Sequence, residues 1–322
     1  RFDCGESGST LRFLIPIALA VAGGGVFTGH GRLMERPQGP YADLFREQGI
    51  SWEQRDGVLT VQGRLSPGEY LLPGNVSSQF FTGLLFALPL LDAPSAVLSS
   101  TEIESREYIT MTMEAMRQAG ISVAEKPGLR GFEVLPAAYC PFAGAVEADW
   151  SQAAFWYAAN FLGSPVEIQG LNPLSAQGDL AVASLYWRLA RPGDREIDVS
   201  GCPDLLPPLA VMAAVRQGTV RFVHAARLRL KESDRLQTTA AMLQALGGTV
   251  EEGADSLTVQ GQPQLLGGTV DGANDHRIVM AAAVAATACA GSVTVLGAEA
   301  VHKSYPDFFT VYQALGGAFH VL

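Results

Sequence analysis

The sequence is poor in charge, in cysteine and in long apolar runs, and each shortage excludes a class of protein. Charged residues make up 17% of its 322 residues, and the excess of acidic ones gives a formal net charge of −10. A phosphate backbone needs clustered Lys and Arg, so we expect no nucleic-acid partner. The four cysteines lie far apart without a Cys-x-x-Cys pair, which argues against a zinc site or disulfide framework and fits a reducing cytoplasm.

The longest apolar stretches, residues 11–27, 80–91 and 278–290, are too short or too broken by Gly, Pro or Thr to span a bilayer. We therefore expect no membrane segment and interpret these stretches as buried helices. With 48% hydrophobic residues, the chain can bury the cores of two ordinary domains. The sequence starts without Met, inside the dense motif "RFDCGESGST", which predicts a fragment of a longer gene product.

One pattern recurs along the chain: an amphipathic helix that ends at Gly, a short β-branched run, a polar turn and a second apolar run. Its copies are marked by Gly49, Gly120, Gly247 and Gly316, where Gly can end a helix in the left-handed conformation. A degenerate copy is expected from Ser184. The spacing of about 70 residues from the first copy to the second, and from the third to the fourth, suits a compact α/β unit.

A Pro- and Gly-rich stretch, "LPAAYCPFAGAVEADW", lies between the second copy and the degenerate one. Such a composition favours a connection between domains. We therefore predict two domains, residues 1–143 and 144–322.

Basic side chains lie where apolar helices are expected to start. Arg12 follows the small residues 5–10, and the other starts carry Lys231 with Arg235, Arg277, and His302 with Lys303. A cation at the positive end of the helix macrodipole opposes folding by about 0.3–1 kcal/mol at an exposed site, whereas a bound anion reverses the sign. These starts together predict anion binding, although a plain cap or a solvated helix start explains each one alone.

Two further helix starts carry neutral or acidic groups. Ser77, Ser78 and Gln79 open one apolar helix, and Asp204 directly precedes another. Ordinary capping explains both. The functional alternatives are a site for a polyol or phosphate at the first start and a general base at the second.

Six short motifs follow one another along the chain: "GESGSTLR", "RPQGP", "GNVSSQF", "RLKESDRL", "NDHR" and "HKSYPDF". Together and in this order, they resemble the 5-enolpyruvylshikimate-3-phosphate synthase family, also called 3-phosphoshikimate 1-carboxyvinyltransferases. The resemblance runs from residue 1 to residue 322. It implies an α/β, two-domain enolpyruvyl transferase fold, an inside-out α/β barrel in which each domain has repeated βαβαββ units about a pseudo-threefold axis.

The resemblance also implies a reaction. The 5-hydroxyl of shikimate 3-phosphate attacks C2 of phosphoenolpyruvate, a tetrahedral adduct forms, and phosphate leaves, in a pathway to the aromatic amino acids. No metal and no organic cofactor are implied. The implied partners are the two small-molecule substrates, and we expect a monomer in the cytoplasm.

By resemblance, three residues carry the catalysis. Asp204 accepts the proton of the attacking hydroxyl, while Glu232 and Lys303 handle protonation of the methylene carbon and the leaving phosphate. The implied shikimate 3-phosphate side consists of Ser77, Ser78, Ser105, Tyr108, Asp204 and Lys231. The implied phosphoenolpyruvate side consists of Gly8, Arg36, Gln79, Glu232, Arg235, Arg277 and Lys303.

Two alternatives are weighed against this hypothesis, and one observation favours the first while another argues against the second. Family members carry a Lys-Ser pair and a following Arg upstream of the first motif, and this sequence lacks them, so we expect weak substrate binding and slow or no turnover from this chain alone. A non-catalytic anion-binding relative is therefore one alternative. The other is the related UDP-N-acetylglucosamine enolpyruvyl transferase, whose reactive Cys before the Arg-Pro loop is missing from "VFTGHGRLMERP".

Overall fold

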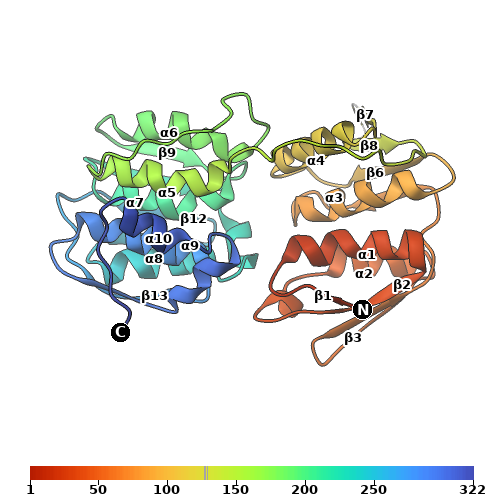
Figure 1. Ribbon diagram of the computed structural model, residues 1–322, viewed down its shortest axis with the longest axis horizontal. Coiled ribbons are helices and arrows are strands. Elements are labelled where there is room, and N and C mark those ends of the chain that lie inside the picture. Colours follow the sequence, from red (N-terminus) through yellow and green to blue (C-terminus); the bar gives the residue numbers. More distant parts are fainter. Residues whose placement is uncertain (127, 129) are drawn as a thin grey trace. The chain divides into compact units, whose positions relative to one another are not determined.

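The chain folds into two compact units. The computed structural model describes residues 1–126, 128 and 130–322 (Figure 1). The units are Arg1–Val146 and Glu147–Leu322, and each has its own hydrophobic core. The exposed residues 135–147 contain the predicted boundary between residues 143 and 144. Among the described residues, no helix combines the length and the apolar character needed to cross a bilayer.

The first unit contains two βαβαββ repeats. The first repeat consists of β1 (Phe2–Asp3), α1 (Gly8–Ala22), β2 (Gly24–Thr28), α2 (Gly39–Glu47), β3 (Ser51–Arg55) and β4 (Val58–Gln62). The second consists of β5 (Glu69–Leu72), α3 (Ser78–Ala87), β6 (Ser95–Ser99), α4 (Arg106–Gln118), β7 (Val123–Lys126) and β8 (Gly131–Val134). The sheet orders are β1-β2-β4-β3 and β5-β6-β8-β7, so the two repeats have the same topology.

The second unit contains one complete repeat between two shorter groups of elements. The complete repeat consists of β9 (Arg195–Asp198), α7 (Leu206–Ala214), β10 (Thr219–Val223), α8 (Arg235–Ala245), β11 (Thr249–Glu252) and β12 (Ser256–Gln260). Helices α5 (Trp150–Phe161) and α6 (Ala181–Leu189) precede it. It is followed by β13 (Gly268–Asp271), α9 (His276–Ala285), β14 (Val293–Leu296) and α10 (Phe308–Ala314).

Strand pairing in the complete repeats follows one rule. The first two strands of each repeat are parallel because a helix crosses between them, and the last strand pairs antiparallel with the second and with the third. Strands β13 and β14 form the same parallel pair. Short 3₁₀ helices lie in the connections: η1 (Leu33–Glu35), η2 (Leu88–Leu90), η3 (Gly178–Leu180), η4 (Pro203–Leu205), η5 (Ala226–Leu230), η6 (Ala286–Ala288) and η7 (Ala298–Lys303).

The repeat prediction is confirmed at its marker glycines and wrong at the degenerate copy. Gly49, Gly120, Gly247 and Gly316 all have positive φ, from 73° to 97°, as helix-ending glycines should. The copy expected from Ser184 has no hairpin, because the strand that follows α6 is β9, which pairs in parallel with β10. The short connection 190–194 between α6 and β9 leaves no room for a separate pair of strands.

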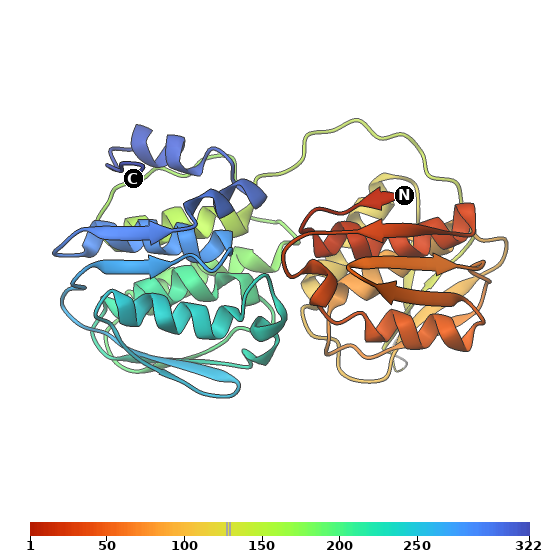
Figure 2. The same ribbon diagram turned by 90° about the horizontal axis from the view of Figure 1, so that it is seen from below.

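The cores of both units form around helices that are almost entirely apolar. Every residue of α7 and of α9 is buried, which is where helices without a polar face must lie. In the first unit, α1 and α3 pack side by side between the two sheets (Figure 1). Figure 2 shows the first unit from below, with the strands of its first repeat in front of the helices. The apolar stretches at residues 11–27, 80–91 and 278–290 are buried helices for most of their length, as predicted.

Close packing of α1 against α3 depends on Gly83. A methyl group at this position would fall far inside van der Waals contact with the carbonyl oxygen of Arg12 and with the hydroxyl of Tyr41. That hydroxyl donates a hydrogen bond to the carbonyl oxygen of Phe80, so it cannot move away freely. The contact matters for function because it positions Arg12 and the start of α3.

Replacing Gly83 by Ala is expected to destabilise the first unit by about 1–3 kcal/mol, because α1 and α3 must separate to admit the methyl group. Urea unfolding followed by circular dichroism measures the change. Gly39→Ala is the matched control, since an added methyl there would meet no atom closer than 4.0 Å. Equal stability of the two variants would contradict the packing role of Gly83.

Candidate active site

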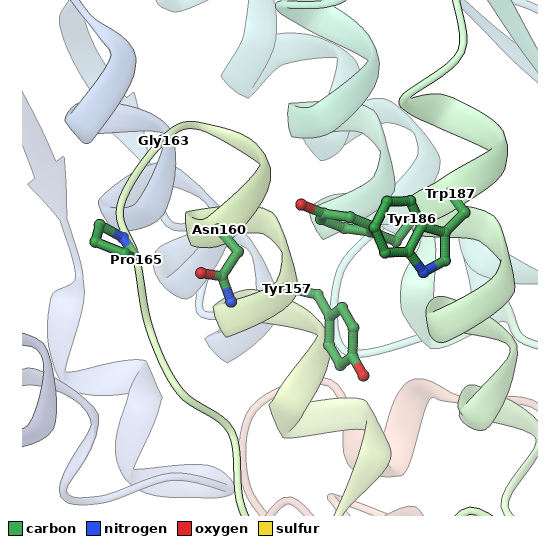
Figure 3. Close-up of a pocket in the computed structure, with 6 residues that line it drawn as sticks. All are labelled: Tyr157, Asn160, Gly163, Pro165, Tyr186 and Trp187. Atoms are coloured by element: carbon green, nitrogen blue, oxygen red, sulfur yellow. The ribbon is translucent and has the colours of Figure 1, made fainter.

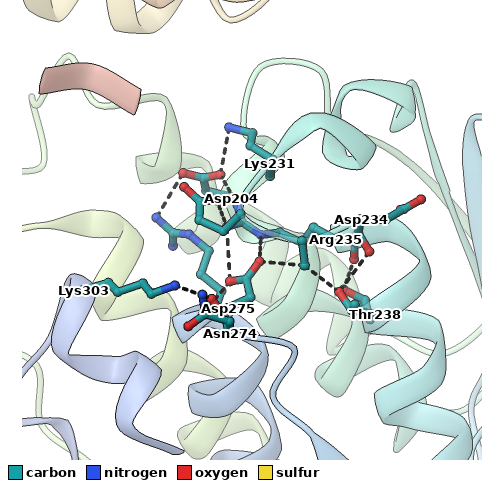
Figure 4. Close-up of polar contacts among 12 residues, drawn as sticks. Asp204, Lys231, Asp234, Arg235, Thr238, Asn274, Asp275 and Lys303 are labelled. Atoms are coloured by element: carbon teal, nitrogen blue, oxygen red, sulfur yellow. Dashed lines mark hydrogen bonds and ion pairs between the residues drawn. The ribbon is translucent and has the colours of Figure 1, made fainter. Parts of the chain in front are cut away.

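Three cations of the second unit converge on the carboxylate of Asp204, and Figure 4 shows part of this group. Lys231 Nζ lies 3.2 Å from Oδ1, and Arg235 Nη1 donates to the same oxygen at 2.8 Å. Arg277 Nη2 donates to Oδ2 at 3.0 Å. The side chain of Asp204 caps neither η4 nor α7. The capping alternative for Asp204 is therefore wrong, and its carboxylate is available to charged groups.

Arg235 is the most enclosed of these three cations. It is the first residue of α8 and is only 1% exposed. Its guanidinium donates to Asp204, to Glu232, and to both carboxylate oxygens of Asp275, at 2.9 and 3.2 Å. A buried guanidinium is stable only where carboxylates or carbonyls accept its hydrogens, and here three carboxylates do so.

Asp275 joins the starts of α8 and α9. It is fully buried and caps α9, where Oδ1 accepts a hydrogen bond from the backbone N–H of Arg277 at 3.0 Å. Its Oδ2 accepts the Ser233 hydroxyl at 2.9 Å. The start of α8 is capped in the same way by Asp234, whose Oδ1 accepts from the N–H of Gln237 at 3.1 Å.

These caps correct the explanation offered for the basic helix starts. Asp234 and Asp275 already supply negative charge at the positive ends of α8 and α9, so a bound anion is not required to offset Arg235 and Arg277 there. Lys303 is not at a helix start at all. It ends η7, and α10 begins at Phe308, so a cation at this position agrees with the helix dipole. Its ammonium donates to the carbonyl of Asn274 at 2.5 Å.

The charges of this group shift one another's pKa values. Burial alone would raise the pKa of Asp204, but Arg277, Lys231 and Arg235 outweigh burial and hold it well below its usual range. Burial likewise opposes ionisation of Asp275, and Arg235 lowers its pKa. The pKa of Lys231 is lowered, chiefly by burial, although Asp204 opposes the shift. Asp204 and Asp275 are therefore ionised at neutral pH.

Two residues that no motif indicated also influence Arg277. Its Nη1 donates to the hydroxyl of Ser151 at 2.5 Å. Asp179, in η3, is 5% exposed and is influenced by both Asp204 and Arg277. Burial, followed by repulsion from Asp204, raises the pKa of Asp179 to about 6. Neither residue lies in a charged run, so no sequence pattern indicated them.

Arg12 organises the polar side chains of the first unit. It is buried, lies above the ring of Phe80, and donates to Gln79 Oε1 at 2.9 Å. Further hydrogen bonds run from its guanidinium to Gln38 Oε1 at 3.3 Å and to the Pro37 carbonyl at 2.9 Å. The resemblance did not include Arg12 in the site, although the basic helix start had pointed to it.

Four predicted site residues gather around Arg12. Ser77 caps α3, as the capping alternative expected, and its hydroxyl accepts from both Gln79 N and Arg12 Nη1. A methyl group on Gly8 would lie 2.9 Å from Arg36 Nη1 and 3.2 Å from Gln79 Oε1, so these three residues adjoin one another.

The remaining predicted residues of the first unit lie at two helix starts. Ser78 is the first residue of α3 and is buried. Ser105 precedes α4 in the left-handed conformation, with φ of 52°, and is also buried. Tyr108 lies in the first turn of α4. Strained, non-glycine backbone such as that of Ser105 is commonest at functional sites.

A separate cavity of about 560 Å³ lies beside α5 and α6 (Figure 3). Its walls are formed by Tyr157, Asn160, Gly163, Pro165, Tyr186 and Trp187. The side-chain amide of Asn160 already donates to the carbonyl of Val166 and accepts from its N–H, both at 2.7 Å, which leaves it little capacity to bind a ligand. None of the predicted site residues lines this cavity, and its walls carry no cation for an anionic substrate.

Comparison with known proteins identifies the relatives of this chain. A family model described as EPSP synthase (3-phosphoshikimate 1-carboxyvinyltransferase) matches residues 1–312. The 3-phosphoshikimate 1-carboxyvinyltransferase of Clostridium acetobutylicum is 42% identical over 99% of this chain and 78% of its own length. That of Clostridium novyi is 40% identical over 98% of this chain and 76% of its own length.

Solved structures share the fold at lower identity. EPSP synthase from Acinetobacter baumannii matches with a TM-score of 0.77 at 22% identity, over 98% of this chain and 79% of its own. The enolpyruvyl transferase NikO from Streptomyces tendae matches with a TM-score of 0.73 at 16% identity, over 96% and 76% respectively. The expected two-domain enolpyruvyl transferase fold is thereby confirmed.

Replacing Arg235 by Gln is expected to destabilise the second unit by about 3–5 kcal/mol, because Asp275 would keep a fully buried charge without its guanidinium. Urea unfolding at neutral pH measures the loss. Arg221→Gln is the control, since its ion pair with Glu196 is exposed and such pairs contribute at most about 1 kcal/mol. Similar losses of unfolding free energy in both variants would show that the buried network stabilises the second unit no more than an exposed ion pair does.

Proposed function

This chain belongs to the EPSP synthase family, the 3-phosphoshikimate 1-carboxyvinyltransferases, and we propose that the group around Asp204 carries the proton transfers of its reaction. The chain is an enolpyruvyl transferase of the shikimate pathway, which moves the enolpyruvyl group of phosphoenolpyruvate to the 5-hydroxyl of shikimate 3-phosphate and releases phosphate. The family match favours this branch over UDP-N-acetylglucosamine enolpyruvyl transferase.

The observation that supports this proposal best is the convergence of Lys231, Arg235 and Arg277 on one ionised carboxylate. A proton acceptor must be ionised before the reaction, and the three cations ensure that Asp204 is. The same cations make it a weak base while no substrate is bound. Anionic substrates that draw these cations toward themselves would raise the pKa of Asp204, and the base would strengthen when its substrate is in place.

The reaction has two halves, an addition and an elimination, and in each half the substrates lose one proton and gain another. In the addition, Asp204 takes the proton of the 5-hydroxyl while the methylene carbon of phosphoenolpyruvate gains one and becomes a methyl group. In the elimination, the methyl group loses a proton and phosphate departs with the C–O bonding pair. We assign the proton at carbon and the proton on the departing phosphate to Glu232 and Lys303.

Glu232 is well placed for proton exchange with a substrate. Its carboxylate accepts from Arg235 yet is less enclosed than that of Asp275, so solvent and substrate can reach it. The ammonium of Lys303 is anchored by the carbonyl of Asn274, next to Asp275, which keeps a cation close to the start of α9. A cation there stabilises the charge that develops on a departing phosphate.

Substrate binding is assigned to both units as the family resemblance implies. For shikimate 3-phosphate the residues are Ser77, Ser78, Ser105, Tyr108, Asp204 and Lys231. For phosphoenolpyruvate they are Gly8, Arg36, Gln79, Glu232, Arg235, Arg277 and Lys303. Arg277 and Arg235 are the cations best fixed for a carboxylate or phosphate, because the carboxylates around them hold each guanidinium in one orientation. We further propose that the enzyme acts as a cytoplasmic monomer without metal or organic cofactor.

Asp204→Asn and Glu232→Gln are each expected to slow phosphate release by about a hundredfold or more, since each removes a proton-transfer group while keeping its shape. Release of inorganic phosphate that depends on shikimate 3-phosphate is measured on this chain and on the full natural gene product. Glu196→Gln, an exposed change in the same unit, serves as the control.

Near wild-type rates for both variants would contradict the assignment of Asp204 and Glu232 as proton-transfer groups. If even the full natural gene product released no phosphate, the hypothesis of a non-catalytic anion-binding relative would be favoured instead.

Gly8→Ala is expected to weaken phosphoenolpyruvate binding about ten- to a hundredfold, because the new methyl group displaces Arg36 and Gln79 from their common position. Calorimetric titration with phosphoenolpyruvate measures the dissociation constant. Gly39→Ala, three residues after Arg36 in the Arg-Pro loop, should leave it unchanged, because its methyl group would meet no atom closer than 4.0 Å. An unchanged constant for Gly8→Ala would remove these three residues from the binding site.

A further inference from the structure

Asp179 is a buried carboxyl that none of the assigned roles uses. It lies in η3, between α5 and α6, and is only 5% exposed. Among the described residues, its Oδ1 is buried with no hydrogen-bond partner. A bare buried carboxylate oxygen is unfavourable, and proteins seldom keep one without a reason.

The groups that face Asp179 come from three neighbouring elements. Ser151 of α5 lowers the pKa of Asp179, and Asp149, which caps the same helix by accepting two hydrogen bonds of 2.7 and 3.2 Å, raises it. Arg277 of α9 attracts it, and Asp204 of η4 repels it. Asp179 therefore interacts electrostatically with the same guanidinium, that of Arg277, which donates a hydrogen bond to Asp204.

Arg277 is held from two sides at once. Its Nη1 donates to the Ser151 hydroxyl at 2.5 Å, and its Nη2 donates to Asp204 at 3.0 Å. Of the two carboxylates, Asp204 has Lys231 and Arg235 as additional partners. Asp179 forms no ion pair with either of these cations, so it is the more easily protonated of the two carboxylates.

We propose that Asp179 is a positioning residue, which acts through Ser151 and Arg277 and sets how strongly the second unit holds an anionic substrate. When Asp179 is ionised, it adds a negative charge beside Arg277 and competes with the substrate for the guanidinium. When it is protonated, that charge is gone and Arg277 is freer to bind an anion. The inference rests on the proposed function only in taking Arg277 as an anion-binding residue.

The direction of the pH dependence follows from linkage. Burial and Asp204 raise the pKa of Asp179 to about 6, so the carboxyl is neutral below that pH and ionised above it. An anion that binds better to the protonated form must in turn favour protonation of Asp179. Anion affinity in the second unit should therefore rise as the pH falls through 6.

The test uses inorganic sulfate, which remains a dianion from about pH 5 to about pH 8, whereas phosphoenolpyruvate and phosphate titrate in this range. The dissociation constant is measured by calorimetry across the range. The wild-type protein should bind sulfate about three- to tenfold more tightly at the acidic end. Asp179→Asn should bind tightly throughout, with that pH dependence removed, whereas Asp179→Glu should restore it.

Two controls separate this effect from others. Glu167→Gln removes an exposed carboxylate of the same unit and should keep the wild-type profile. Arg277→Gln should abolish the pH-dependent binding, which isolates it from sulfate held by the first unit. A wild-type profile in Asp179→Asn, weaker binding at neutral pH in that variant, or binding that ignores Arg277→Gln would each overturn the proposal. Turnover is not measured, so an error in the role of Asp204 as a base leaves the result interpretable.

Discussion

Burial of the Arg235 guanidinium is the constraint on which the rest of the second unit's site depends. A charge that is 1% exposed must be matched by carboxylates, and Asp204, Glu232 and Asp275 provide them from η4, the start of α8 and the start of α9. Three chain segments that are distant in sequence are thereby held together. The carboxylates in turn orient Arg277 and Lys231, so the cations offered to a substrate are fixed before it arrives.

The repeats explain why these groups meet. In each βαβ segment the two strands are parallel, so the helices begin at the carboxyl ends of the strands, along one edge. Every predicted site residue lies in such a strand-to-helix connection or in the first turn of its helix. Gly8 is the first residue of α1 and Ser77 caps α3, just as Asp204 precedes α7 and Asp275 caps α9. Helix N-termini carry positive partial charge, which suits a substrate with phosphates and a carboxylate.

The sequence predicted the parts of the site that have a local signature. Asp204, the Lys231 to Arg235 run and Arg277 all stand beside apolar helices, and periodicity locates such helices well. Ser151 and Asp179 were missed because their roles depend on Arg277, more than ninety positions away, and neither lies in a charged run. The hairpin predicted after Ser184 was wrong because a helix followed by Gly is only the first half of the repeated pattern. The second half, two strands joined by a polar turn, is absent there. Lys303 was assigned to a helix start because a 3₁₀ turn has too short a period to show in the sequence.

The balance of charge around Arg235 limits what an anion can do there. Lys231, Arg235 and Arg277 are matched by Asp204, Glu232 and Asp275, so these six side chains are neutral together, and an ionised Asp179 makes the group negative. A substrate anion entering such a group must either break ion pairs or bring a proton with it. Breaking the pairs to Asp204 strengthens that residue as a base, and adding a proton to Asp179 restores neutrality. Anion binding and proton transfer are therefore coupled by the same side chains, which is what a reaction that adds and then removes a proton requires.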